Sequence, residues 1–243
     1  MRYKVTVAYD GLNYAGFQSQ TNALAIQDVI ENVMEKIFSK KMRIIMSSRT
    51  DAGVHAYGQV FHFDIDKKMD LYRLKYSFNS LLPKDIHVTK IEEVTEAFHA
   101  RYSVKKKTYE YLINLGEYDV FLVGRAYQCF YKLDVDLMKQ GAALFLGRHD
   151  FGSFNTSSYK EYPDQVRNIT CFRITRKGDL LKITITSSGF LRNMVRIMVG
   201  TLIDLGRGQK SLEDIRDMLE HPSKSTRRYN ADPHGLYLKK IYY

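Results

Sequence analysis

The chain is 243 residues long, 44% hydrophobic and 26% charged, which is typical of a globular protein with one or two domains. Its formal net charge of +10 favours a polyanionic partner, because clustered Lys and Arg side chains displace counterions from phosphates, although a merely soluble basic protein can carry the same charge. Two distant cysteines, Cys129 and Cys171, match no metal-ligand spacing. The strand-like alternation of residues 1–10 argues against a signal peptide, and no apolar stretch is long enough for a bilayer, so we predict a cytoplasmic protein.

The first half of the sequence predicts the order β-α-β-β-α-β. The expected elements are strand 2–9, helix 26–38, strands 42–48 and 60–65, helix 71–82 and strand 86–94. The first helix carries one apolar stripe, formed by Ile26, Val29, Ile30, Val33 and Ile37. This order is the split βαβ pattern of ferredoxin-like domains.

The second half repeats the order without repeating the residues. The expected elements are strand 107–115, helix 135–146, strands 168–176 and 180–187, helix 190–205, a short helix 212–220 and strand 236–242. We therefore predict an α+β fold of two ferredoxin-like halves, residues 1–103 and 104–243, with the joint near residues 100–106. Two similar sheets are expected to meet in a shared cleft.

The polar loop 49–59 is the first candidate site. Its centre, Asp51, is followed by Ala52 and Gly53, which leave room for a ligand and allow the backbone a positive φ. Aspartate is also common in ordinary turns, where its side chain binds nearby amides. Four potential donors flank it, more than a turn needs: Arg49, Thr50, His55 and Gln59.

The predicted helix 190–205 is apolar around most of its circumference, so we expect it to be buried. Arg192, Arg196 and Gly200 lie four residues apart along one narrow face. A guanidinium among apolar neighbours needs a carboxylate to offset its desolvation, whereas Arg192 is expected to reach the surface. If both halves face one cleft, Asp51 is the natural partner of Arg196, and this pairing would favour the ionised carboxylate.

Tyr109 and Tyr111 alternate along the strand that opens the second half, directly after three lysines, Lys105, Lys106 and Lys107. Both rings should lie on one face of the sheet. Tyrosines on strands usually pack in a core, but basic residues beside strand aromatics also suit a nucleic acid. Stacking on a base contributes roughly 1–3 kcal/mol.

Nucleotide and metal sites have little support in the sequence. There is no G-x-x-x-x-G-K-[ST] loop and no G-x-G-x-x-G after a strand. A metal site could be imagined from four residues, Asp51, His55, His62 and Asp64, but no compact ligand motif accompanies them. We expect His62 to pack in the sheet instead. The sequence thus predicts no cofactor and no metal.

Residues 49–60 carry the signature R-T-D-A-G-V-H-A-x-G-Q-V, which resembles the TruA family of tRNA pseudouridine synthases. Further matches follow in the same order: Tyr9-Asp-Gly, Tyr14-x-Gly-Phe-Gln, Phe98-His-Ala-Arg101, Lys107-Thr-Tyr109-x-Tyr111, Gly147-x-His-Asp-Phe-x-Ser-Phe154, Phe190-x-x-Asn-Met-Val-Arg196 and Gly235-Leu-Tyr-Leu238. The lysine run 105–107 and the pair 191–192 fall at positions that vary in the family. The resemblance covers most of the chain.

The resemblance implies two ferredoxin-like halves joined across a central catalytic cleft, and a homodimer. It also implies an RNA-modifying isomerase that converts uridine to pseudouridine, at positions 38 to 40 of the tRNA anticodon stem-loop. On the matching positions, Asp51 is the catalytic aspartate, Tyr109 the active-site tyrosine and Arg196 the partner of the aspartate. A paralogue acting on a different RNA would share these motifs.

This chemistry fits the residues present. The C1′–N1 bond of uridine breaks, the uracil turns and C5 joins C1′, without net oxidation or hydrolysis. One ionised carboxylate is needed, either as a nucleophile or to assist a glycal-like path, whereas a glycosidase would use two. The uridine must leave its stack, which costs a few kcal/mol, and Tyr109 is the ring we expect to receive it.

Substrate contacts are assigned to eight residues in all: Tyr109, Arg49, Thr50, His55, Gln59, Lys105, Lys106 and Lys107. Two other classes of function stay open from the residues alone. A non-catalytic RNA-binding protein would need no Asp51. A metal-dependent hydrolase using His55 and His62 would lose activity with a chelator.

Overall fold

The computed structural model describes residues 1–243, which fold into two compact units. The first unit contains residues 1–105 and 237–243, and the second contains residues 106–236. Each unit combines a sheet with helices, so the predicted α+β class is confirmed. None of the helices combines the length and the apolar character that a membrane span requires.

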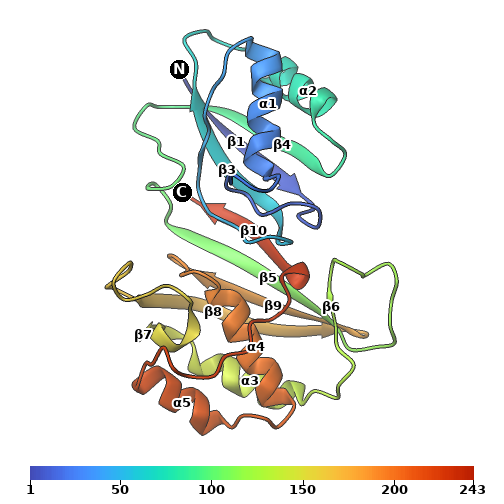
Figure 1. Ribbon diagram of the computed structural model, residues 1–243, viewed down its shortest axis with the longest axis vertical. Coiled ribbons are helices and arrows are strands. Elements are labelled where there is room, and N and C mark those ends of the chain that lie inside the picture. The colour runs from blue at the N-terminus through green and yellow to red at the C-terminus, as the bar shows by residue number, and fades with distance from the viewer. The chain divides into compact units, whose positions relative to one another are not determined.

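Three long antiparallel strands form the sheet of the first unit, in the order β4-β1-β3. They are β1 (Arg2–Tyr9), β3 (His55–Asp64) and β4 (Ile86–Val94). Every second residue of β1 is buried, as expected for a strand with one covered face. Helices α1 (Ile26–Phe38) and α2 (Leu71–Leu81) lie on one face of this sheet (Figure 1).

Two further strands share the other edge of β3, because β1 already occupies its first edge from Asp64 to Ala56. The short β2 (Ile45–Met46) pairs antiparallel with Phe61 and His62. The last strand, β10 (Leu236–Tyr242), pairs in parallel with His55 and Ala56. The sequence-based division assigned strand 236–242 to the second half, whereas the structure pairs it with β3.

Strand β3 begins at His55, earlier than the strand predicted at residues 60–65. The sequence concealed this start because residues 55–59 are polar or small. Main-chain pairing with β1 and β10 forms the strand there without apolar alternation. Conversely, only residues 45–46 of the predicted strand 42–48 are paired.

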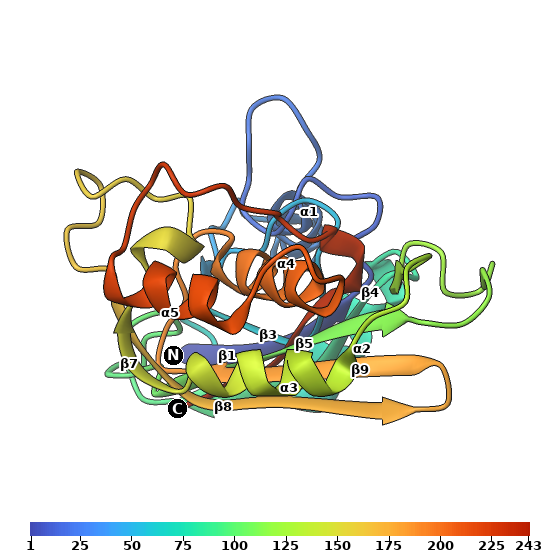
Figure 2. The same ribbon diagram turned by 90° about the horizontal axis from the view of Figure 1, so that it is seen from below.

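The sheet of the second unit has the antiparallel order β5-β9-β8-β7. Its strands are β5 (Lys106–Asn114), β7 (Gly147–Asp150), β8 (Val166–Lys177) and β9 (Leu180–Ser187), and β6 (Tyr127–Gln128) adds a short parallel pairing with β5. Three helices pack together beside these strands. They are α3 (Val135–Leu144), α4 (Met194–Gly206) and α5 (Leu212–Glu220). Figure 2 shows α3 in front of β8 and β9.

Helix α4 forms the centre of this second core. All of its residues are buried except Arg196 and Asp204, so the predicted buried helix is confirmed. It begins at Met194, directly after a turn that the Met194 amide closes by donating to the Leu191 carbonyl at 3.1 Å, and in which Asn193 adopts a left-handed conformation (φ 60°). Two short 3₁₀ turns complete the unit, η1 (Gly152–Phe154) and η2 (Pro233–Gly235).

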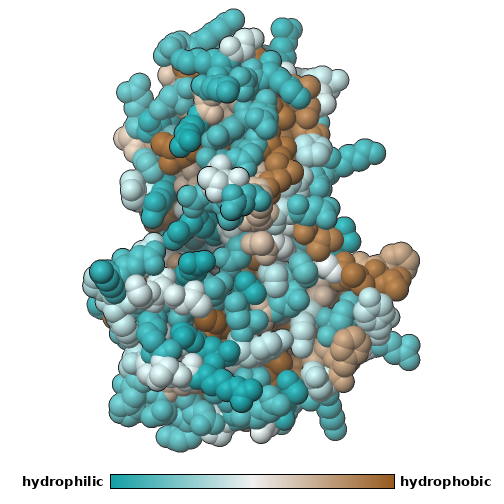
Figure 3. Space-filling model, in the orientation of Figure 1, coloured by the Kyte–Doolittle hydropathy of each residue, from teal (hydrophilic) through white to brown (hydrophobic).

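The connection from β5 to β6 differs from the rest of the second unit. It exposes Val120, Phe121 and Val123, and it forms the apolar projection at the right of Figure 3. Together with the β8–β9 turn it lines a surface pocket of about 510 Å³. Exposed apolar surface of this kind often marks a contact with another molecule.

Candidate functional site

The Asp51 loop, residues 47–54, connects β2 to β3 in the first unit. Gly53 has a φ of 76°, which confirms the predicted left-handed position. The Val54 amide donates to the Asp51 carbonyl at 3.2 Å and closes the turn. Within the loop Arg49 is exposed and Asp51 is half-buried.

The segment after β1, residues 11–17, supports the backbone of this loop. The Gly53 amide donates to the Tyr14 carbonyl and the Phe17 amide donates to the Thr50 carbonyl, both at 3.3 Å. A side chain at Gly16, whose φ is 95°, would collide with the Thr50 carbonyl, and one at Gly11 would collide with the Val54 carbonyl. Glycine therefore allows two loops to lie backbone against backbone.

Polar side chains below the loop anchor it further. The Thr50 hydroxyl bonds to the Tyr9 hydroxyl at 2.8 Å. The Gln59 amide donates to the Ser48 carbonyl at 2.6 Å, and Gln59 is fully buried. Both side chains therefore help to hold the loop in place, and the substrate contacts assigned to Thr50 and Gln59 from the sequence stay a prediction.

His55 is also buried, at 2% exposure. Its Nδ1 accepts a hydrogen bond from the Gly11 amide at 3.0 Å and lies 3.0 Å from a carboxylate oxygen of Asp10. Its ring stacks on Tyr237 of β10. His55 thus links the start of β3 to the segment that supports the Asp51 loop.

Tyr14 is a support that we did not assign from the sequence, although its motif was recognised. Its hydroxyl donates to Asp85 at 2.8 Å. Burial, followed by this hydrogen bond to the carboxylate, raises the pKa of Tyr14 well above its usual value, so Tyr14 remains a neutral donor. The signal was available, since Tyr14 precedes Gly16 in the motif Tyr14-x-Gly-Phe-Gln.

Tyr109 and Tyr111 lie on β5 of the second unit, where they pair with Ile185 and Ile183 of β9. The ring of Tyr109 meets that of Phe190 edge to face, with the centroids 5.1 Å apart, and only 6% of Tyr109 is exposed. Tyr111 is fully buried, and its hydroxyl donates to the Asp232 carbonyl at 2.8 Å. Tyr111 is therefore a core residue.

Arg196 is the half-buried cation of α4. Its Nε donates to the Ala231 carbonyl at 2.7 Å, and the Ala231 amide donates back to the Arg196 carbonyl at 3.2 Å. Its Nη1 lies 3.4 Å from the Asn193 side-chain oxygen. These bonds fix the direction of the guanidinium. Arg192 is exposed, as predicted.

Residues 222–231, called the strap, run from α5 to Ala231. A side chain at Gly200 would collide with the Tyr229 carbonyl, so this glycine lets the strap lie directly on α4. Lys224 ties the strap down by donating to the Gly152 carbonyl at 2.8 Å and to the Gln165 side chain at 2.7 Å. The anchor of Arg196 is therefore itself fixed.

The lysine run is accessible. Lys105 and Lys106 are exposed and Lys107 is half-buried, which suits contacts with phosphates.

The predicted site residues are divided between the two units. The first unit contains Arg49, Thr50, Asp51, His55 and Gln59, and the second contains Tyr109 and Arg196. The ion pair expected between Asp51 and Arg196 would join the two units and stays a prediction.

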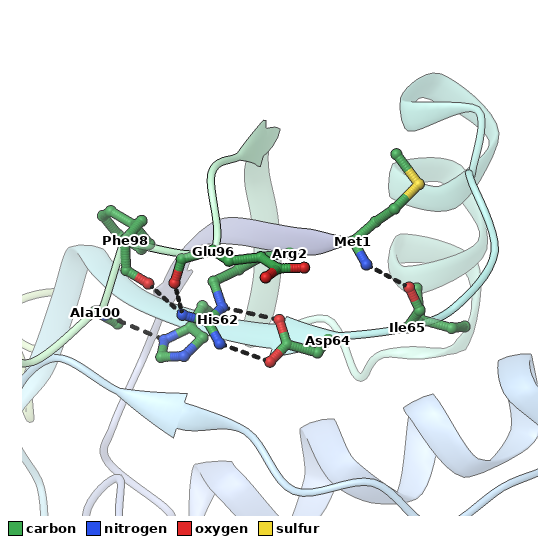
Figure 4. Close-up of polar contacts among 8 residues, drawn as sticks. All are labelled: Met1, Arg2, His62, Asp64, Ile65, Glu96, Phe98 and Ala100. Atoms are coloured by element: carbon green, nitrogen blue, oxygen red, sulfur yellow. Dashed lines mark hydrogen bonds and ion pairs between the residues drawn. The ribbon is translucent and has the colours of Figure 1, made fainter.

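Figure 4 shows the contacts of His62 and Asp64, two residues considered as metal ligands. Arg2 holds Asp64 with two hydrogen bonds of 2.8 and 2.7 Å. The Ala100 amide donates to His62 Nδ1 at 3.1 Å, and burial lowers the pKa of His62 to about 4. His62 packs in the sheet, as expected. No three His, Cys, Asp or Glu side chains gather to hold a metal ion.

Comparisons with known proteins agree with the signature. Residues 5–103 and 142–243 match the family model described as tRNA pseudouridine synthase. The chain is 43% identical to a tRNA pseudouridine synthase A of an Exiguobacterium species over 100% of this chain and 98% of that protein. It is 42% identical to the tRNA pseudouridine synthase A of Bacillus subtilis over 100% of this chain and 99% of that protein.

Among solved structures, a chain of a Cbf5-Nop10-Gar1 complex aligns with a TM-score of 0.37 and 11% identity. The alignment covers 83% of this chain and 45% of that chain. A likeness of this size carries no argument about fold or function.

Proposed function

The chain belongs to the tRNA pseudouridine synthase family, and from this premise we propose that it isomerises uridine to pseudouridine in tRNA with Asp51 as the catalytic carboxylate. The observation that carries this assignment is the Asp51 loop. Its half-buried carboxylate is presented by a backbone that glycine contacts and buried hydrogen bonds hold from below. A catalytic group gains from such fixed geometry, because little reorganisation remains for the reaction step.

The proposed reaction conserves all atoms of the substrate. The C1′–N1 bond breaks, the uracil rotates within the site and C5 bonds to C1′. N1 ends with a proton and C5 loses one. The carboxylate of Asp51 either bonds transiently to C1′ or assists a glycal-like path, and both routes need its ionised form.

Tyr109 and Arg196 complete the proposed site. We assign Arg196 to pairing with Asp51, supported by the bonds that orient its guanidinium. Tyr109 is assigned to stacking on the uracil once the nucleotide has left its helix, supported by its place on a strand just after the lysine run. Proton removal from C5 is a second role for the Tyr109 hydroxyl.

We further propose that the modified uridines are at positions 38 to 40 of the anticodon stem-loop, and that the protein is a cytoplasmic homodimer. The exposed apolar connection between β5 and β6 supports a subunit contact. Arg49, Lys105, Lys106 and Lys107 contact the RNA backbone. The two units divide the proposed site, with Asp51 in the first and Tyr109 and Arg196 in the second.

The test is to incubate the purified protein with unmodified tRNA transcripts in monovalent salt, with EDTA and without cofactors. New pseudouridines are mapped by carbodiimide treatment and primer extension. We expect stops in the anticodon stem-loop that EDTA does not remove. Binding without any new stop would support the non-catalytic alternative, and stops confined to another RNA would support a paralogue.

A further inference from the structure

A β-bulge interrupts the pairing of β3 with β1 directly after the Asp51 loop. Val7 pairs with Gln59 and Tyr9 pairs with Ala56, so two residues of β3, Tyr57 and Gly58, lie opposite Ala8 alone. Bulges of this kind redirect a side chain and are frequent beside functional sites. This one contains Tyr57, the variable position of the signature.

Tyr57 is the exposed end of a stack of three rings. Its ring stacks on Tyr237 with the centroids 5.0 Å apart and an angle of 12° between the planes. Tyr237 in turn stacks on His55 at 4.6 Å and 23°. His55 and Tyr237 are 2% and 7% exposed, whereas Tyr57 is 48% exposed. The buried rings thus hold an accessible aromatic surface at a fixed angle.

A cation lies at the same place. The ammonium of Lys239 is 4.6 Å from the centroid of the Tyr57 ring. Gly58 permits the close approach of β10 that brings it there, because a Cβ at Gly58 would lie 2.9 Å from the Lys239 carbonyl. An aromatic platform with a lysine beside it offers a base a stacking surface and a phosphate a counter-charge.

The two most exposed tyrosines of α2 lack this arrangement. Tyr72 and Tyr76 on α2 are 81% and 69% exposed, and neither stacks on another ring. They are ordinary surface residues of an amphipathic helix. Two buried rings hold the Tyr57 ring in one orientation, yet about half of the Tyr57 surface stays in contact with water. Burial of apolar surface therefore does not explain why this ring is held.

We propose that Tyr57 stacks on a nucleobase of the RNA substrate next to the reacting uridine, and that Lys239 contacts a neighbouring phosphate. The base takes the place over the ring that the lysine now occupies, and the flexible lysine side chain moves to the phosphate. This inference rests on the proposed function, because it takes the substrate to be RNA. It adds a binding subsite on the first unit, six residues after Asp51 in the chain.

The chain has no tryptophan, so Tyr57→Trp places a single fluorescent probe at the proposed subsite. Titration with an unmodified anticodon stem-loop should quench this fluorescence, because a stacked base quenches indole. Tyr72→Trp is the matched control and should change little. An unquenched Tyr57→Trp variant that still binds the RNA would overturn the stacking assignment.

Affinity measurements test the same subsite without a probe. We expect Tyr57→Ala to raise the Kd for tRNA roughly 5- to 100-fold, while Tyr57→Phe retains binding. Lys239→Gln should weaken binding and lower the slope of log K against log salt by about one. Unchanged affinity and salt slope in both variants, with an unchanged thermal midpoint, would refute the inference.

Pseudouridine mapping on the same proteins separates this inference from the proposed function. If RNA quenches Tyr57→Trp and Tyr57→Ala binds RNA more weakly, but the wild-type protein forms no pseudouridine, the subsite is supported and the isomerase is contradicted. Normal pseudouridine formation by Tyr57→Ala, with unchanged KM and kcat, would contradict the subsite and leave the isomerase intact.

Discussion

The Asp51 loop and helix α4 are held in place by different means. The loop lies on another loop, with buried polar side chains such as Thr50 and Gln59 fixing it from below. Helix α4 lies in an apolar core, and its exceptional cation, Arg196, is oriented by the strap. In both regions a glycine permits close backbone contact, Gly16 under the loop and Gly200 under the strap. The proposed carboxylate thus depends on local hydrogen bonds, whereas its proposed partner depends on a hydrophobic core.

The largest effect is expected for the side chain that the loop presents. Asp51→Asn removes the charge and keeps the shape, so we expect pseudouridine formation to fall by at least about 10³-fold. Binding to tRNA and the thermal midpoint should change little, because the supporting bonds below the loop remain. Asp66→Asn, an exposed residue after β3, is the matched control. Normal turnover by Asp51→Asn would remove the catalytic assignment.

Arg196 should combine a functional and a structural effect. Arg196→Leu leaves the Ala231 carbonyl without its donor, which costs about 1–3 kcal/mol of unfolding free energy, and we expect activity to fall about 100-fold or more. Arg196→Lys keeps the charge but loses the fixed fork of donors, so its activity should also fall. Arg192→Gln on the exposed face serves as the control. If Arg196→Leu keeps wild-type activity, the residue serves only to hold the strap.

The two supporting glycines allow a direct comparison of the regions. Gly16→Ala meets the Thr50 carbonyl and a positive φ, and Gly200→Ala meets the Tyr229 carbonyl. We expect each to lower the unfolding free energy by about 1–3 kcal/mol in urea titrations. Gly178→Ala is the control, since its φ is positive but its surroundings are open. Equal stability of Gly16→Ala and wild type would show that the loop adapts rather than being held.

A last effect is seen only when the pH is lowered. The unfolded chain protonates His62 near its ordinary pKa of 6.5, whereas the folded chain does so near a pKa of about 4. The unfolded state therefore gains a proton first as the pH falls, so the stability that neutral His62 provides is present above pH 6.5 and lost between 6.5 and about 4. His62→Gln, whose amide oxygen can still accept from Ala100, should flatten this pH dependence in thermal unfolding. An equally steep curve would assign it to other groups.

Helices were more predictable than strand pairings. Residues 26–38 and 212–220 form helices with the predicted bounds, because their apolar stripes repeat at helical spacing. The early start of β3 and the partner of β10 depend on contacts between residues distant in sequence, and no local pattern records them.

The sequence allowed candidate site residues to be proposed, but it did not reveal the contacts that support them. Asp51 and Arg196 stood out as charges in unusual surroundings. The glycine contacts below the Asp51 loop and the ring stack under Tyr57 depend on which backbones approach each other. Thr50 and Gln59 stay predicted ligand contacts, and their bonds to Tyr9 and Ser48 could not be foreseen, since a sequence shows that a donor is present but not which way it points.

The position of β10 also bears on how the protein is made in the cell. The first unit needs residues 237–243, which are synthesised after the whole second unit. While the ribosome is still producing residues 106–236, the edge of β3 at His55 and Ala56 lacks its parallel neighbour. The Asp51 loop, which leads into that edge, therefore reaches its final setting only after the second unit has emerged.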